Sequence, residues 1–170
     1  GVVSASSTGA LVTIPAENLM RFQLLVLLSA LAAAPSAAAQ VSITGLRDLT
    51  FGPVIVGIPS SVGPSHPTKS GQFRITAPLS SKVQIRFTLP DALAGPGGAQ
   101  LPISFGSNDA MAIGSAPGST PMTFNPKATR NPQFQPSTAY DVFIGGTVTP
   151  AGNQQPGSYA ATITLTITNF

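Results

Sequence analysis

Apolar and polar residues alternate along several short stretches of the chain, most regularly over residues 82–89. Apolar side chains, beginning with Val83, occupy every second position there, and polar or charged residues lie between them. A period of two places one face of a strand in a core and the other in water. Pro90 then ends the stretch, because proline cannot donate to a β-ladder. The pattern predicts a half-buried β-strand.

Similar short stretches recur through the rest of the chain, separated by proline, glycine, serine and asparagine. No window beyond residue 40 has the 3.6-residue period of an amphipathic helix, and Gly145-Gly146 predicts a bulge. Many short strands with frequent turns are typical of an antiparallel β-sandwich or barrel, so we expect an all-β fold. The further strands are expected over residues 41–46, 54–58, 72–76, 101–105, 122–124, 140–148 and 158–168.

The last of these strands is uncharged and contains no proline. Ile163, Leu165 and Ile167 occupy one face, and threonines occupy the other. At an open sheet edge, a segment of this kind would promote aggregation. Two interpretations remain open: an ordinary central strand with neighbours from its own chain, or a strand that another chain covers.

The first 39 residues are interpreted separately from the fold. Residues 20–39 begin with Met-Arg, continue as an apolar run over residues 22–34 and end in three alanines. This is the pattern of a secretory signal peptide, and the apolar run is too short to span a bilayer. Residues 1–19 match no export element and are left out of the fold prediction. We therefore expect an exported protein with one domain over residues 40–170.

Composition excludes several classes of function. The chain has no cysteine, so it holds no disulfide and no cysteine-ligated metal. Charged residues make up 8%, against about 25% in a typical soluble domain. The net charge of +3 comes from scattered lysines and arginines, which does not favour nucleic-acid binding. Hydrophobic residues make up 42% and are patterned, which favours a packed fold.

Residues able to carry catalysis are few and far apart. His66 is the only histidine and lies in a loop-like stretch. Acid–base and nucleophilic catalysis need two positioned groups, and hard metal ions need clustered carboxylates. We therefore expect no enzyme, no catalytic residue, no metal and no cofactor, and we expect Asp48 to form an ion pair with Arg47. The side-chain carboxylates after residue 39 are Asp48, Asp91, Asp109 and Asp141.

Two motifs carry a family resemblance, which covers the first motif and residues 145–170. The first is a Leu-x-Phe-Gly box, and the second is a Pro-Gly-x-Tyr element that leads into the alternating last strand. Both resemble spore coat protein U-like domains and archaic chaperone–usher pilins, together with a related uncharacterised bacterial family. The motif residues are Leu49, Phe51, Gly52, Pro156, Gly157 and Tyr159.

The resemblance implies an incomplete immunoglobulin-like β-sandwich that lacks its final strand. In the family, a periplasmic chaperone fills the resulting groove, and a neighbouring subunit replaces it at the outer-membrane usher. Ile163, Leu165 and Ile167 would border the groove, and the carboxylate of Phe170 would anchor the chaperone. The expected product is a surface fibre with a role in adhesion, reached through the periplasm.

One departure from the family leaves alternatives open. Only residues 40–50 precede Phe51 after the predicted cleavage site, whereas polymerising pilins carry a donor extension there. The chain would then be a tip or terminal subunit, or a self-complete secreted or coat-like β-sandwich that forms no fibre. A carbohydrate-binding module or small hydrolase is a third interpretation. The absence of tryptophan and of paired carboxylates disfavours it.

Overall fold

A computed structural model describes residues 41–79, 81–130 and 138–169. All of these residues belong to one compact unit, Ala39–Phe170. They form β-strands joined by loops and one short 3₁₀ turn, Pro96–Gly98, and every strand pairing between them is antiparallel. The predicted all-β antiparallel class is confirmed. The predicted leader over residues 1–19 and signal peptide over residues 20–39 lie outside the described residues.

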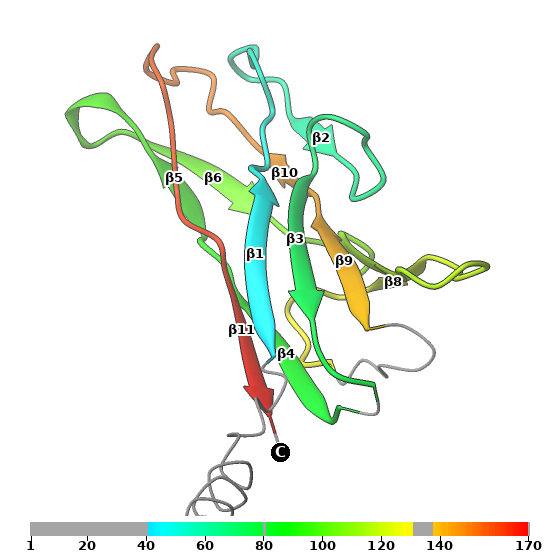
Figure 1. The fold of residues 1–170 in the computed structure, drawn as a ribbon. Helices are drawn as coiled ribbons and strands as arrows, with labels where there is room; N and C mark the ends of the chain where they lie inside the picture. Colours follow the sequence, from blue (N-terminus) through cyan, green and yellow to red (C-terminus); the bar gives the residue numbers. More distant parts are fainter. Residues whose placement is uncertain (1–40, 80, 131–137, 170) are drawn as a thin grey trace, which may run out of the picture. The chain divides into compact units, whose positions relative to one another are not determined.

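The largest sheet has five strands, and its edge strands are β1 and β8 (Figure 1). The register between β1 and β3 shifts close to the end of β1, where Leu46 is 47% exposed. The sheet order is β1 (Ser42–Arg47), β3 (Gly71–Thr76), β9 (Ala139–Ile144), β7 (Ala110–Gly114) and β8 (Met122–Phe124).

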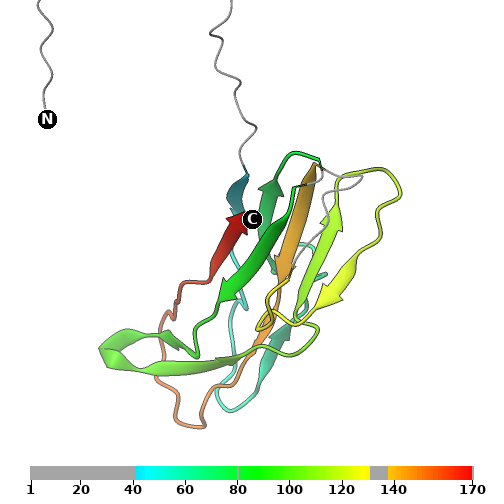
Figure 2. The ribbon, with the colours of Figure 1, turned by 90° about the horizontal axis from the view of Figure 1, so that it is seen from below.

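The remaining strands form two smaller sheets. The four-stranded sheet has the order β2 (Ser60–Val62), β10 (Gly146–Val148), β6 (Gln100–Ser104) and β5 (Ala92–Ala94). The two-stranded sheet pairs β4 (Val83–Thr88) with β11 (Thr164–Asn169) along their whole length. In both views β11 and β4 lie across from the five-stranded sheet (Figure 2).

One hydrophobic core joins all three sheets, an arrangement that agrees with a β-sandwich. The alternation predicted over residues 82–89 is present, because β4 buries every second side chain and exposes the others. Across the layers, the rings of Phe73 on β3 and Phe87 on β4 meet edge to face, with centroids 5.9 Å apart. The buried core residues include Ile75, Val83, Ile85, Leu101, Ile103, Val142, Ile144, Val148 and Leu165.

The chain passes from one sheet to another at Gly145. The strand predicted over residues 140–148 is interrupted there, so that β9 belongs to the five-stranded sheet and β10 to the four-stranded sheet. A Cβ atom on Gly145 would overlap the carbonyl oxygen of Val62, so only glycine fits this close backbone approach. The expected bulge at Gly145-Gly146 is therefore a change of sheet.

Most other predicted strands are present within a residue or two of their expected bounds. The prediction over residues 54–58 was wrong, because this apolar stretch is a turn-containing loop with Ile55 67% exposed. The strand expected over residues 158–168 begins only at Thr164. Strands β2, β5 and β7 were not predicted. In the part of the chain that is described, no helix is long and apolar enough to cross a membrane.

Candidate functional site

A groove of about 970 Å³ opens between the end of β1 and the segment that leads into β11. We call it the β1–β11 groove. One wall consists of Gly45, residues 47–54 and Val56, and the other consists of residues 154–163. Figures 1 and 2 show β1 and β11 as neighbours in both views, although no ladder joins them. The groove therefore lies beside the end of β1 and the segment that precedes β11, and no residue of β11 itself lines it.

The floor of the β1–β11 groove is apolar. It contains Leu101 and Ile103 from β6, Ile144 from β9 and Val148 from β10, each of them buried. Phe73 of β3 lies partly buried beside them. An occupant of the groove would therefore contact side chains that belong to the common core.

Strand β11 has a paired edge and an open edge. Its residues pair with β4 in continuous register, from Thr164 opposite Thr88 to Asn169 opposite Val83. Ahead of the strand, Ala160 forms an isolated bridge with Ala94 on the same side. Among the described residues, no other strand pairs with β11. The backbone donors and acceptors of the other edge are therefore open to a further strand.

The motif residues found in the sequence come together at this groove. The Leu-x-Phe-Gly box forms part of the first wall, and the Pro-Gly-x-Tyr element forms part of the second. The two motifs are about one hundred residues apart, so the sequence did not show that both would line the same groove. All six motif residues line the groove: Leu49, Phe51, Gly52, Pro156, Gly157 and Tyr159.

Tyr159 fixes the second wall through hydrogen bonds. Its hydroxyl donates to the carbonyl oxygen of Gln155 at 2.6 Å and accepts from Nε2 of Gln154 at 2.7 Å. The same Nε2 also donates to the carbonyl oxygen of Gln100, at the start of β6, at 3.1 Å. A Cβ atom on Gly95 would overlap the tyrosine ring, so the ring packs directly on that backbone. The loop between β10 and β11 is thus tied to the β5–β6 hairpin.

The three predicted groove residues occupy different environments. Ile163 lines the β1–β11 groove and packs partly buried against the core. Leu165 is 7% exposed and belongs to the core, opposite Phe87 of β4. Ile167 is partly buried against the same core and does not line the groove. Phe170, the predicted chaperone anchor, lies outside the described residues.

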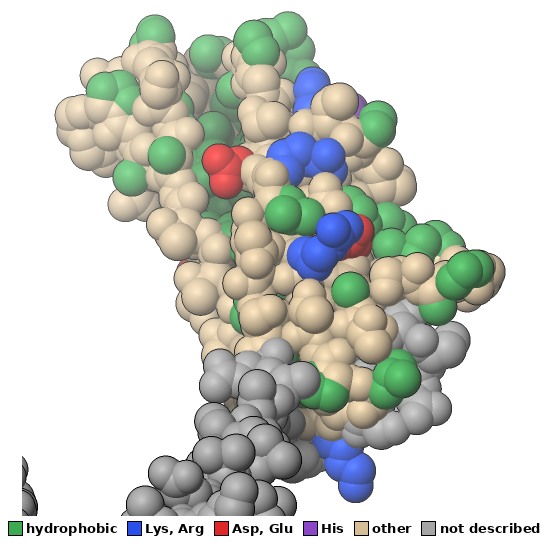
Figure 3. Space-filling model, viewed as in Figure 1, with side chains coloured by type: hydrophobic (Ala, Val, Ile, Leu, Met, Phe, Trp, Pro, Cys, Tyr) green, Lys and Arg blue, Asp and Glu red, His purple; other side chains and the backbone are tan. Residues whose placement is uncertain are grey.

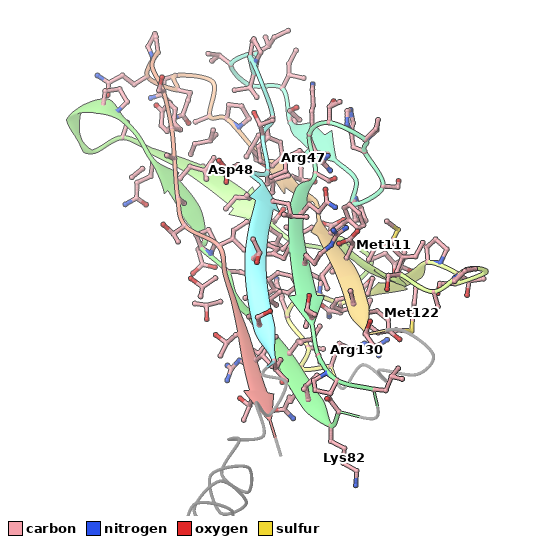
Figure 4. The ribbon with its side chains drawn as sticks, in the orientation of Figure 1. Arg47, Asp48, Lys82, Met111, Met122 and Arg130 are labelled. Atoms are coloured by element: carbon pink, nitrogen blue, oxygen red, sulfur yellow. The ribbon has the colours of Figure 1, made fainter. Side chains whose placement is uncertain are left out.

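The expected ion pair between Arg47 and Asp48 is absent. Arg47 donates from Nε to the carbonyl oxygen of Ser70 at 2.7 Å, from Nη2 to Oγ of Ser70 at 2.9 Å, and from Nη1 to the carbonyl oxygen of Pro67 at 2.6 Å. Asp48 follows directly after the end of β1, and its side chain forms no ion pair with Arg47. Figure 4 shows Asp48 on the side of β1 toward the groove and Arg47 on the side toward β3.

The other titratable residues singled out in the sequence lie away from one another. Nδ1 of His66 accepts from the backbone N–H of Lys69 at 3.1 Å and thereby holds a turn. Asp109 accepts from the backbone N–H of Gly106 at 2.7 Å. Asp91 is exposed beside β5. Within the described ranges, no three histidine or acidic side chains are grouped closely enough to hold a metal ion.

One ion pair was not predicted. Arg74 on β3 and Asp141 on β9 are cross-strand neighbours, with Nε–Oδ1 and Nη2–Oδ2 distances of 2.7 and 2.8 Å. The hydrogen bond from Asp141, followed by its charge, raises the pKa of Arg74. Because both groups lie at the solvent-facing surface, the pair adds little to stability. Both strands were expected and each carries one of the two charges. Only the register of β3 against β9 shows that the two charged residues are direct neighbours.

Apolar side chains are exposed next to the groove. The loop after β1 presents Ile55, Val56 and Ile58 to solvent, with exposures of 67, 47 and 55%. Val56 also lines the groove itself. Contiguous exposed apolar side chains are typical of interaction sites. The apolar character of the groove thus continues onto the surface around it.

Comparison with known protein families and with curated proteins found no family model and no curated protein that matches the chain.

Proposed function

We propose that the chain is a structural subunit of a bacterial surface fibre, and that its β1–β11 groove accepts a strand from another polypeptide. One observation carries this proposal: among the described residues, β1 and β11 each pair with a single neighbour, and a groove with an apolar floor opens between the end of β1 and the segment that precedes β11. An added strand would satisfy the open backbone groups and bury its alternate side chains on the floor. The domain would then be an immunoglobulin-like sandwich that another chain completes.

The strand order supports this interpretation. Immunoglobulin constant-type domains place their strands A, B, E and D in one sheet and C, F and G in the other. If β1, β3, β4, β7, β9 and β11 are strands A to F, the large sheet has the order A-B-E-D with β8 added beyond D, and the two-stranded sheet pairs C with F. No described strand occupies the position of strand G beside β11.

Tyr159 provides a second, independent support. Many immunoglobulin-like domains have a tyrosine at the corner between strands E and F, and its hydroxyl binds backbone a few residues upstream. Tyr159 lies in the connection that leads to β11, and its hydroxyl donates to the carbonyl oxygen four residues upstream, on Gln155. Its position therefore fits that of a tyrosine corner.

The partners follow from the resemblance rather than from the groove alone. A periplasmic chaperone would occupy the groove during export, and a neighbouring subunit would replace it at an outer-membrane usher. The exposed loop with Ile55, Val56 and Ile58 would be covered in the same contact. We infer a location at the cell surface and a role in adhesion, as a tip or terminal subunit if no donor strand is available.

A peptide that supplies the missing strand tests the proposal. A synthetic peptide with valine at every second position should raise the melting temperature of the purified chain, because a ligand that binds only the folded state stabilises it by about 2.7 kcal/mol at one hundred times Kd. The same peptide with prolines at the intervening positions should have no effect, because proline cannot donate to the ladder.

Two variants locate the binding. Ile163→Lys places a charge in the groove and should abolish the stabilisation by the peptide. Thr164→Lys, the next residue on the exposed face, is the matched control and should leave it intact. If the folded wild-type chain is not stabilised by any such peptide, the domain is complete by itself, and the coat-like interpretation takes the place of the fibre subunit.

A further inference from the structure

The β1–β11 groove contains one carboxylate whose charge no described side chain neutralises. Arg47 and Asp48 are the only charged residues among those lining the groove. Asp48 is exposed, and the ion pair found among the described residues joins Arg74 to Asp141 instead. Figure 3 shows an acidic side chain, in red, beside a recess of the surface at the place where Figure 4 labels Asp48.

Arg47 is held too firmly to provide the missing charge. Its guanidinium donates three hydrogen bonds of 2.6 to 2.9 Å to Pro67 and Ser70, and Ser70 is fully buried. Hydrogen bonds from a charged group to buried acceptors are costly to break. Turning the guanidinium toward Asp48 would leave the buried hydroxyl and carbonyl without that donor. The carboxylate therefore remains available to a partner that enters the groove.

We propose that Asp48 selects the occupant of the groove by charge, so that the preferred strand carries a lysine or arginine at the position facing Asp48. This inference rests on the proposed function, because it assumes that a strand enters. A strand lying over Asp48 removes water from the carboxylate, and a buried charge without a partner is unfavourable. A cation in the occupant offsets that loss, whereas a carboxylate in the occupant adds repulsion.

The same charge argues that the occupant belongs to a different polypeptide. A second copy of this chain could donate the segment ahead of its own β1. After the cleavage expected behind residue 39, only residues 40 and 41 precede β1, and neither carries a charged side chain. A segment this short cannot lie along the groove as a strand, and it offers no charged side chain to Asp48. The groove is thus better matched to a cationic strand from a different polypeptide than to a segment from a second copy of this chain.

Peptides that differ at a single position test this selection. A series of valine-alternating peptides is prepared, and each carries a single lysine at a different intervening position. For every position, a peptide with glutamine and a peptide with glutamate in place of that lysine serve as comparisons. At one register, the lysine peptide should bind the full chain about fivefold more tightly than the glutamine peptide, the upper range for a solvent-accessible ion pair. The glutamate peptide should bind least, and the preference should shrink in high salt.

Substitutions at Asp48 assign the effect to this residue. Asp48→Asn should remove the preference for lysine while the glutamine peptide binds as before, and Asp48→Lys should make the glutamate peptide the best ligand. Asp91→Asn, which removes an exposed carboxylate outside the groove, is the control and should keep the preference. An N-acetylated peptide of residues 40–46 represents the segment that a second copy of this chain could offer.

The outcomes separate the two proposals. If lysine, glutamine and glutamate peptides bind equally at every register, or the preference survives Asp48→Asn, charge selection is wrong and the strand-accepting groove stands. If the peptide of residues 40–46 binds more tightly than any lysine peptide, the heterologous occupant is wrong. If no peptide binds the folded chain, the groove accepts no strand, and both proposals are overturned.

Discussion

Replacing Leu165 by lysine should destabilise the domain far more than the same change one residue earlier. Leu165 is 7% exposed and packs within the shared core, whereas the neighbouring Thr164 is exposed. Removing a buried leucine side chain to alanine costs about 2–5 kcal/mol. Lysine at this position also brings an ammonium group into the core without a partner there, which adds a desolvation cost of several kcal/mol. The sum approaches the total stability of a typical domain, about 5–15 kcal/mol.

The assay is equilibrium unfolding in urea, followed by far-ultraviolet circular dichroism, with the free energy of unfolding obtained by linear extrapolation. Leu165→Ala should lose about 3 kcal/mol, near the middle of the range for buried leucines. Leu165→Lys should be largely unfolded without urea. Thr164→Lys should stay within about 0.5 kcal/mol of wild type, because surface changes away from special features have small effects.

A similar stability for Leu165→Lys and Thr164→Lys would refute the assignment of Leu165 to the core and return it to the open groove. The comparison of Leu165→Lys with Thr164→Lys also shows whether a loss of binding is caused by a loss of folding. A Leu165 variant that fails to bind a partner would report lost folding, whereas Ile163→Lys changes a residue of the groove wall. Binding should therefore be judged on Ile163 variants that unfold with the wild-type transition.

Further predictions concern local contacts outside the peptide experiments. Gly95→Ala should displace Tyr159 and lower the melting temperature measured by calorimetry, while Gly152→Ala, which adds its methyl group in open space, should leave it nearly unchanged. His66→Ala should cost about 1 kcal/mol in urea unfolding through the lost turn hydrogen bond, with peptide binding unaltered. Asp141→Asn should leave the urea midpoint nearly unchanged at neutral pH, because its exposed ion pair adds little to stability.

Local patterns predicted the strands whose alternation is regular. Residues 82–89 became β4, and the short stretch 122–124 became β8 with the expected bounds. In β4 every second side chain is buried as the alternation predicts, whereas in β8 only Phe124 is buried and Met122 is 47% exposed. The stretch 54–58 misled the prediction because apolar, β-branched residues usually occupy strands. Here they lie on an exposed loop beside the groove, where their apolar character fits a contact surface.

The candidate site was only partly predictable for a related reason. Ile163, Leu165 and Ile167 share one face of the last strand, so alternation alone assigns them the same role. Their roles diverge because β11 begins only at Thr164: Ile163 lies in the preceding segment that lines the groove, whereas Leu165 and Ile167 lie on the strand that pairs with β4. Asp48 was assigned to Arg47 from adjacency in the sequence. The register of β1 against β3 instead directs the arginine to Ser70.

The sequence by itself determined the all-β class, most of the strands and the motifs that line the groove, because alternation, turn residues and composition act over a few neighbouring positions. Only the tertiary structure decided that β1 and β11 each pair with a single strand among the described residues, that the chain changes sheets at Gly145, and that Asp48 forms no ion pair with a described side chain. These features depend on contacts between residues far apart in the chain. Strand pairing and side-chain packing select such contacts, and no local pattern encodes them.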